Sequence, residues 1–190
     1  MTNSLKMLAV LLAAIWVGGL FTVGFVLAPY LFILAFRHSP FIPHTGVAAE
    51  LIGPLLYGSY IASLILAVIL IVMLFILRKR NQLPLGGQIF LSEIGLSLAF
   101  LSMVINYGWC SPKVAAIRQE LDVRFGGFHL TDPAEPLYHQ FMHYHLISVV
   151  LFGLCFLGAL ICLLCISQFR EVKEMSRSET QRHGEKRNLD

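Results

Sequence analysis

Four long runs of apolar residues dominate this chain and restrict the folds that it can adopt. They cover residues 7–36, 48–77, 89–110 and 144–166. Each run is at least as long as the roughly 20 residues that a helix needs to cross a bilayer. The composition agrees, because 57% of the 190 residues are hydrophobic and only 13% are charged. We therefore predict an all-α fold, an integral membrane four-helix bundle that occupies residues 1–167 as one domain.

Basic residues are distributed unequally between the two sides that these runs define. Ten fall on one side: Lys6, Arg78, Lys79, Arg80, Arg170, Lys173, Arg177, Arg182, Lys186 and Arg187. Four fall on the other: Arg37, Lys113, Arg118 and Arg124. Because Lys and Arg are enriched in cytoplasmic loops, we expect both termini to be cytoplasmic, in a bacterial inner membrane. The net charge of +3 follows from this topology and does not indicate a nucleic-acid partner.

Both ends of the chain have further features. The first run is longer than one crossing requires, and Pro29 within it should introduce a kink. Residues 168–190 mix charges of both signs with Ser and Gln, and almost none of them is apolar. Because such a segment has little to bury, we predict a basic, disordered cytoplasmic tail.

The connection between the third and fourth runs, residues 111–142, is long for two adjacent helices. Ser111 and Pro112 are typical of the start of a helix. An apolar stripe follows at helical spacing: Val114, Ile117 and Leu121. We therefore predict an external loop that carries a short amphipathic helix across the mouth of the bundle. The sequence from Asp132 to Glu135 then resembles a capping box, which predicts that the fourth helix begins outside the lipid.

Histidines gather on the predicted outer side, which suggests a metal site. His139 and His143 are four residues apart and would share a helix face, with Met142 beside them. Imidazole and thioether groups are ligands for copper, and imidazole also suits zinc. The alternative is that these histidines bind water, lipid headgroups or loop carbonyls, because a helical pair without a visible third ligand is common.

A second polar group is expected inside the bundle at the same level. Glu50 begins the second helix and Asn106 ends the third, while His145 lies deeper than His139 and should point inward. Polar side chains in a membrane need partners, so these three form a candidate polar bundle site. A purely structural hydrogen bond is the alternative for His145, and a solvated charge favoured by the helix dipole is the alternative for Glu50.

Other polar residues have simpler explanations. Glu93 should pair with the basic turn at residues 78–80. Cys162 and Cys165 have the spacing of half a zinc or redox motif, but they lie in an apolar run and are expected to pack as small residues. No serine or cysteine nucleophile has a visible base, and no phosphate-binding glycine loop occurs in the sequence. We therefore expect a protein that is not an enzyme.

Four sequence blocks resemble a known family when taken in order. They are WVGGLF at residues 16–21, APYLF at 28–32, PKVAAIR at 112–118 and FMHYHLIS at 141–148. This pattern resembles the transmembrane protein 205-like domain, a family of four-helix membrane proteins of unknown function. The resemblance covers nearly the whole chain before the tail. His145 matches the family's histidine four residues after Phe141, whereas His139 and His143 have no matching position.

The first block also has more distant similarities. The Trp-x-Gly-Gly element at residues 16–19 is similar to the copper-resistance D membrane domain and to the haem-containing protoporphyrinogen oxidase of bacteria. The haem enzyme would place a ligand in the first helix, but the first run of this chain contains no histidine. Its activity is therefore not carried over.

Two functions remain open on these grounds. The first is a binding or transport module with a site for a small ligand, a metal ion or haem at the outer end of the bundle. The second is a small structural subunit of a larger membrane complex. In either case the lipid bilayer is the surrounding solvent, and a membrane-protein partner or a homo-oligomer is expected.

Overall fold

The computed structural model describes residues 2–30, 45–79, 87–125 and 136–187, and every residue in these ranges is helical. The elements are α1 (Thr2–Phe21), η1 (Thr22–Leu27), α3 (Thr45–Lys79), α4 (Gly87–Ile105), η2 (Asn106–Cys110), α5 (Ser111–Phe125) and α6 (Pro136–Arg187). The labels η1 and η2 mark short π-helical segments. The predicted all-α fold is confirmed.

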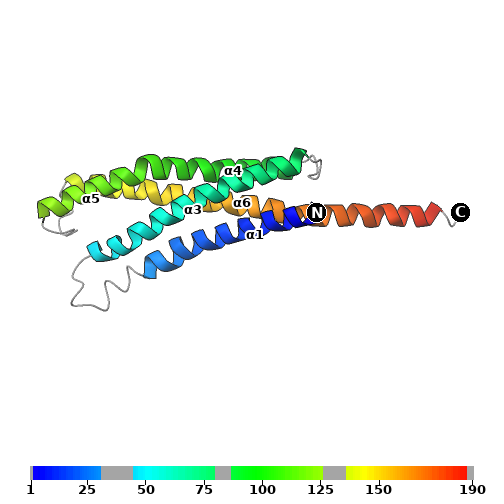
Figure 1. Ribbon diagram of the computed structural model, residues 1–190, viewed down its shortest axis with the longest axis horizontal. Coiled ribbons are helices and arrows are strands. Elements are labelled where there is room, and N and C mark those ends of the chain that lie inside the picture. The colour runs from blue at the N-terminus through cyan, green and yellow to red at the C-terminus, as the bar shows by residue number, and fades with distance from the viewer. Residues whose placement is uncertain (1, 31–44, 80–86, 126–135, 188–190) are drawn as a thin grey trace.

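Four segments of the described chain are long and apolar enough to cross a membrane. They are Ser4–Tyr30, Gly53–Lys79, Gly87–Leu121 and Pro136–Gln168. Successive segments run in opposite directions, so that the N-terminus, the end of α3 and the start of α4 lie at one end of the bundle (Figure 1). The chain therefore has the architecture of a multi-pass membrane protein.

The two ends of the bundle differ in chemistry. We call the end that holds the N-terminus, Arg78 and Lys79 the basic end. The opposite end holds the starts of α3 and α6 together with α5. We call it the tyrosine end, because all six tyrosines lie toward it: Tyr30, Tyr57, Tyr60, Tyr107, Tyr138 and Tyr144. Tyr and Trp concentrate where a membrane protein meets the lipid–water interface, and Trp109 is also exposed at this end.

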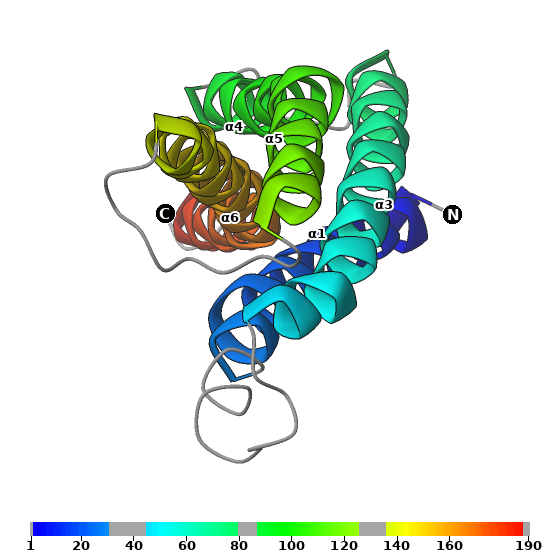
Figure 2. The same ribbon diagram turned by 90° about the vertical axis from the view of Figure 1, so that its left-hand side faces the viewer.

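Helices α4 and α6 pack closely, and glycine is the reason. Gly95 and Gly158 face each other, and a Cβ atom added to Gly95 would lie 2.7 Å from the carbonyl oxygen of Gly158. Small residues let membrane helices approach until their backbones touch. Gly158 therefore has a packing role, whereas Gly18 and Gly153 have no such neighbour among the described residues. Seen along the bundle, α4 and α6 lie on one side and α1 and α3 on the other (Figure 2).

Both π-helical segments stand just before a proline. The amide of Ala28 donates to the carbonyl of Val23, and the amide of Ser111 donates to that of Asn106, each five residues back. Pro29 and Pro112 follow these amides directly. A proline lacks an N–H and its ring clashes with the carbonyl four residues earlier, so the helix adjusts its hydrogen bonding locally. At Pro29 the expected irregularity therefore takes the form of a π-helical turn.

The chain passes through Ser111 without starting a new helix, which corrects one prediction. Ser111 has helical dihedral angles, φ −60° and ψ −42°, and does not act as an N-cap. The predicted amphipathic helix exists as α5, but it prolongs the third span lengthwise (Figure 1). Its buried Ile117 and Leu121 pack against the first turns of α6. The prediction that this helix crosses the mouth of the bundle is wrong, because its apolar stripe finds a partner alongside.

The start and end of α6 also bear on predictions. The predicted capping box, Asp132 to Glu135, lies outside the described residues. At the other end α6 continues to Arg187 and projects past the basic end (Figure 1). Residues 168–187 are described as part of α6, and the expected disorder of this tail stays a prediction. Residues 168–187 contain no proline and many Glu, Lys, Arg and Gln residues, which have high helix propensity.

Candidate functional site

A cluster of polar side chains lies at the tyrosine end, and the buried Asn106 is at its centre. Asn106 is 0% exposed, although it belongs to a membrane-spanning segment. Its Nδ2 donates to the carbonyl oxygen of Ser148 at 3.1 Å, and the Ser148 hydroxyl donates to its Oδ1 at 2.8 Å. These two bonds tie η2 to α6. A carboxamide can donate two hydrogen bonds and accept two, so Asn106 retains capacity for further partners.

Hydroxyl groups from α3 and η2 extend the cluster. The buried Tyr60 side chain of α3 lies near the polar groups of Ser148, Asn106 and Ser111. Tyr57 lies about one turn before Tyr60 on α3. Its hydroxyl shares a hydrogen bond of 2.6 Å with the hydroxyl of Tyr107 in η2. Three spans therefore contribute polar groups at one level of the bundle. We call Tyr57, Tyr60, Asn106, Tyr107 and Ser148 the polar cluster.

Aromatic packing holds the polar cluster in place. The ring of Phe152, four residues after Ser148, lies 6.3 Å from the ring of Tyr60 between centroids. Gly24 of η1 presses against the same Phe152 ring, since an added Cβ would lie 3.1 Å from its Cζ atom. The π-helical turn in the first span therefore contacts the base of the cluster, and all four spans take part.

A thiol and an indole complete the connection between η2 and α6. The buried Cys110 thiol donates to the carbonyl oxygen of Tyr144 at 3.0 Å. Trp109 meets the Tyr144 ring edge to face, with 5.7 Å between centroids. The π-helical segment is thus attached to α6 at both of its ends, by Asn106 and by Cys110. Such attachment fixes the polar groups of η2 in position.

The structure brings together only part of the predicted polar bundle site. Asn106 is buried as expected. His145 is exposed on α6 and stacks on Phe141, with ring centroids 5.6 Å apart and an interplanar angle of 6°. The prediction that His145 points into the bundle is therefore wrong, and Ser148 is the partner of Asn106. The side chain of Glu50 lies outside the part of the chain whose side chains are described.

The proposed metal ligands are at the surface of the same end. His139 and His143 are both exposed on the first turns of α6. Among the described residues, no group of three or more His, Cys, Asp or Glu side chains is close enough to hold a metal ion. His38, His44 and His129 lie outside those residues. The two-histidine metal site therefore stays a prediction.

The remaining polar residues fit their simpler explanations. Arg78 and Glu93 form an ion pair at 2.8 Å, which confirms the pairing expected for Glu93. Cys162 and Cys165 are buried as free thiols, which confirms their packing role. Trp16 is buried in the apolar core, and its indole N–H has no partner among the described residues. A buried unpaired N–H donor costs about 1–3 kcal/mol.

Sequence reasoning missed Ser148 and Tyr60 because only their own polarity marks them in the sequence. Both lie in runs that are apolar on every side, so no periodicity shows which face of the helix is buried. The signal that could have found Ser148 is its polarity in the first turns of a long apolar run. Its distance from Asn106 along the chain gives no indication that the two residues meet.

Comparison with known proteins gives no functional assignment for this site. No family model, no curated protein and no solved structure matches this chain. The resemblance to the transmembrane protein 205-like domain therefore stays a prediction, and any functional assignment must rest on the geometry of the tyrosine end.

Proposed function

We propose that this chain is a non-enzymatic binding or transport module, similar to the transmembrane protein 205-like family, that receives a small ligand at the tyrosine end. In this proposal the protein spans a bacterial inner membrane with both termini in the cytoplasm. The basic end supports that orientation, because Lys6, Arg78, Lys79 and the basic residues of the α6 extension lie there, and basic residues are enriched on the cytoplasmic side.

The observation that supports a binding role is the buried Asn106 amide and the hydroxyls around it. Polar groups cost free energy in a membrane interior, and they commonly mark ligand or ion sites there. The polar cluster draws on three spans and includes two residues of a π-helical segment, a feature that is frequent at functional sites. Its groups are neutral amide and hydroxyl groups. They suit hydrogen bonding to a small polar ligand better than acid–base chemistry.

Native mass spectrometry of the protein in mild detergent tests this proposal. The wild type should retain a small non-lipid molecule after gentle purification, and Tyr60→Phe should retain less of it. The phenylalanine keeps the ring that packs on Phe152 and removes only the hydroxyl. Val123→Ala, on the exposed surface of α5, serves as the control and should retain the wild-type amount. Wild-type protein without any such molecule would contradict a binding role.

A metal ion or haem is the narrower version of the same proposal. His139 and His143 at the surface of α6 are the residues that could hold copper or zinc, with a third ligand still to be found. Elemental analysis and an absorption spectrum of the purified wild type test this version. Stoichiometric copper or zinc that is lost in both His139→Ala and His143→Ala would support it. A colourless, metal-free wild type would exclude it and leave the polar cluster untouched.

A second candidate is a small structural subunit, and the first span favours it. In the most apolar window of that span only 17% of the residues are buried, against 39% for each of the other three spans. Gly18 on α1 has no neighbour within 4 Å of an added Cβ. Such an open helix face could pack against a membrane-protein partner or a second copy. Copurification of one partner protein in fixed stoichiometry would support this candidate.

A further inference from the structure

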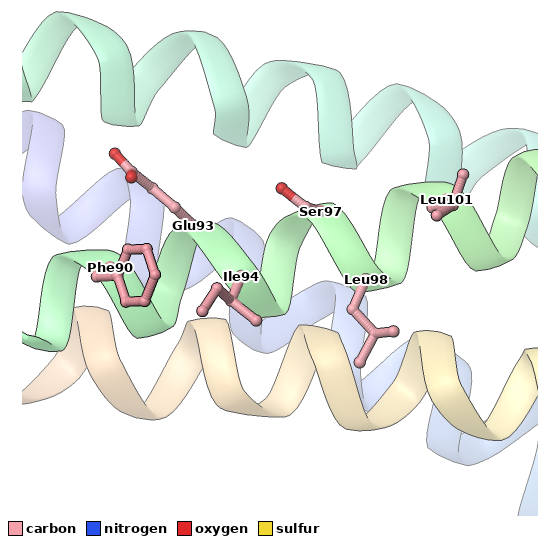
Figure 3. Close-up of a pocket in the computed structure, with 6 residues that line it drawn as sticks. All are labelled: Phe90, Glu93, Ile94, Ser97, Leu98 and Leu101. Atoms are coloured by element: carbon pink, nitrogen blue, oxygen red, sulfur yellow. The ribbon is translucent and has the colours of Figure 1, made fainter.

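An open groove runs along the surface of α4, starting near the basic end (Figure 3). It has a volume of about 420 Å³. Its lining residues recur at three- and four-residue intervals on one face of the helix: Phe90, Glu93, Ile94, Ser97, Leu98 and Leu101. Glu93 and Ser97 point toward α3, whereas Leu98 points toward α6. Helix α6 borders the groove on one side, because it approaches α4 closely at Gly95 and Gly158.

Charge is concentrated at one end of this groove. The Nη1 atom of Arg78 contacts Oε1 of Glu93 at 2.8 Å, and both side chains remain substantially exposed, at 61% and 41%. A guanidinium has five N–H donors, so this contact leaves most of them available for another acceptor. Lys79 follows directly and is exposed. With Arg78 and Lys79 positive and Glu93 negative, one net positive charge remains among these three residues.

The position of the groove in the span matches one leaflet of a bilayer. Arg78 is next to the last residue of its membrane span, Gly53–Lys79, so the ion pair lies near the headgroup region. From Glu93 to Leu101 the groove follows eight residues of helix, which is roughly 12 Å at 1.5 Å per residue. Half of a hydrocarbon core of about 30 Å is about 15 Å. The groove therefore has the length that one acyl chain needs within its leaflet.

We propose that this groove is a binding site for an anionic phospholipid. The phosphate accepts hydrogen bonds from the free guanidinium donors of Arg78 and is attracted by Lys79. Glu93 holds the guanidinium at the mouth of the groove. One acyl chain lies against Ile94, Leu98 and Leu101. Basic sites between membrane helices commonly bind the headgroups of anionic lipids. The site lies at the basic end and is independent of the ligand proposed for the tyrosine end.

Thermal unfolding in detergent with added lipid tests the proposal. Phosphatidylglycerol should raise the Tm of the wild type more than phosphatidylcholine does at equal concentration. Arg78→Gln should weaken the apparent affinity for phosphatidylglycerol by about fivefold, the typical contribution of one basic residue at an anionic surface. Glycerol phosphate, which has the headgroup charge without acyl chains, should give no shift. Comparing the two lipids within each variant corrects for any change in the stability of the variant itself.

A second variant tests the acyl-chain part of the site. Ser97→Trp fills the groove and leaves every charge in place, so it should reduce the effect of phosphatidylglycerol. Val72→Trp, on the exposed surface of α3, is the matched control and should behave as the wild type. Equal stabilisation of the wild type by the two lipids would overturn the proposal. An unchanged preference for phosphatidylglycerol in Arg78→Gln or Ser97→Trp would also overturn it. Chemical cross-linking of two copies through this face of α4 would overturn it as well, because a second copy would then occupy the groove.

Discussion

Gly95 of α4 and Gly158 of α6 face each other so closely that neither position can accept a side chain. A Cβ atom on Gly158 would lie 2.8 Å from the backbone nitrogen of Ala99, and backbone atoms cannot move aside as a side chain can. This contact sets the distance between the two helices that carry Asn106 and Ser148. The polar cluster therefore depends on a glycine contact that lies closer to the basic end.

Gly158→Ala should destabilise the protein through this contact. Forcing one methyl group into a well-packed interface typically costs about 1–3 kcal/mol. Gly153→Ala is the matched control on the same helix, because nothing lies within 4 Å of its added Cβ. Reversible unfolding in mixed micelles measures both. Similar free energies of unfolding for the two variants would show that the helices can separate without cost.

Leu121→Ala should loosen α5 from α6. Leu121 is buried against the first turns of α6, and removing a buried leucine side chain costs roughly 2–5 kcal/mol. Val123 is 79% exposed on the same helix, so Val123→Ala should have almost no effect. Hydrogen–deuterium exchange of the residues of α5 detects the difference. Unchanged protection in Leu121→Ala would mean that α5 is not held by this contact.

The fold could be predicted from the sequence because it depends on the length of apolar runs. Runs such as 48–77 and 144–166 leave little alternative to a spanning helix, whatever their neighbours are. The continuity of α4 with α5 could not be predicted in the same way. Ser111 and Pro112 are typical of a helix start, and only the π-helical bonding from Ser111 to Asn106 lets the chain continue.

The candidate site was predictable only in part, for a related reason. Asn106 is conspicuous, since an amide in an apolar run must find a partner. Its partner depends on how α6 is rotated about its axis. His145 and Ser148 are three residues apart and lie close together on α6, so the sequence pattern does not show which of them meets Asn106. The more polar His145 was the natural choice, yet packing at Gly158 and Phe152 turns Ser148 toward Asn106.

Cysteine labelling should establish the orientation of the bundle. The four native cysteines are buried, so a membrane-impermeant maleimide has little background reaction with them. Val123→Cys places a thiol on α5 at the tyrosine end, and Gln168→Cys places one at the basic end; both positions are exposed. In intact cells Val123→Cys should react, and Gln168→Cys should react only after the cells are opened. The reverse pattern would place the polar cluster on the cytoplasmic side.

The hydrogen bonds between Asn106 and Ser148 give the sharpest test of the site, because they assign different effects to neighbouring residues of α6. Ser148→Ala removes the donor to Oδ1 of Asn106 and leaves that buried oxygen without this partner, which should cost about 1 kcal/mol of stability. His145→Leu should cost much less, because His145 is exposed and contacts Phe141 by stacking.

A double-mutant cycle separates the bond from other effects of substitution. Asn106→Leu should be more destabilising than Ser148→Ala, since it also breaks the bond from Nδ2 to the Ser148 carbonyl. In the Asn106→Leu background, Ser148→Ala should have little further effect, and the coupling energy should be about 0.5–1.5 kcal/mol. A coupling energy near zero would mean that the two residues do not stabilise the bundle together. A larger loss of stability in His145→Leu than in Ser148→Ala would indicate that His145 points into the bundle after all.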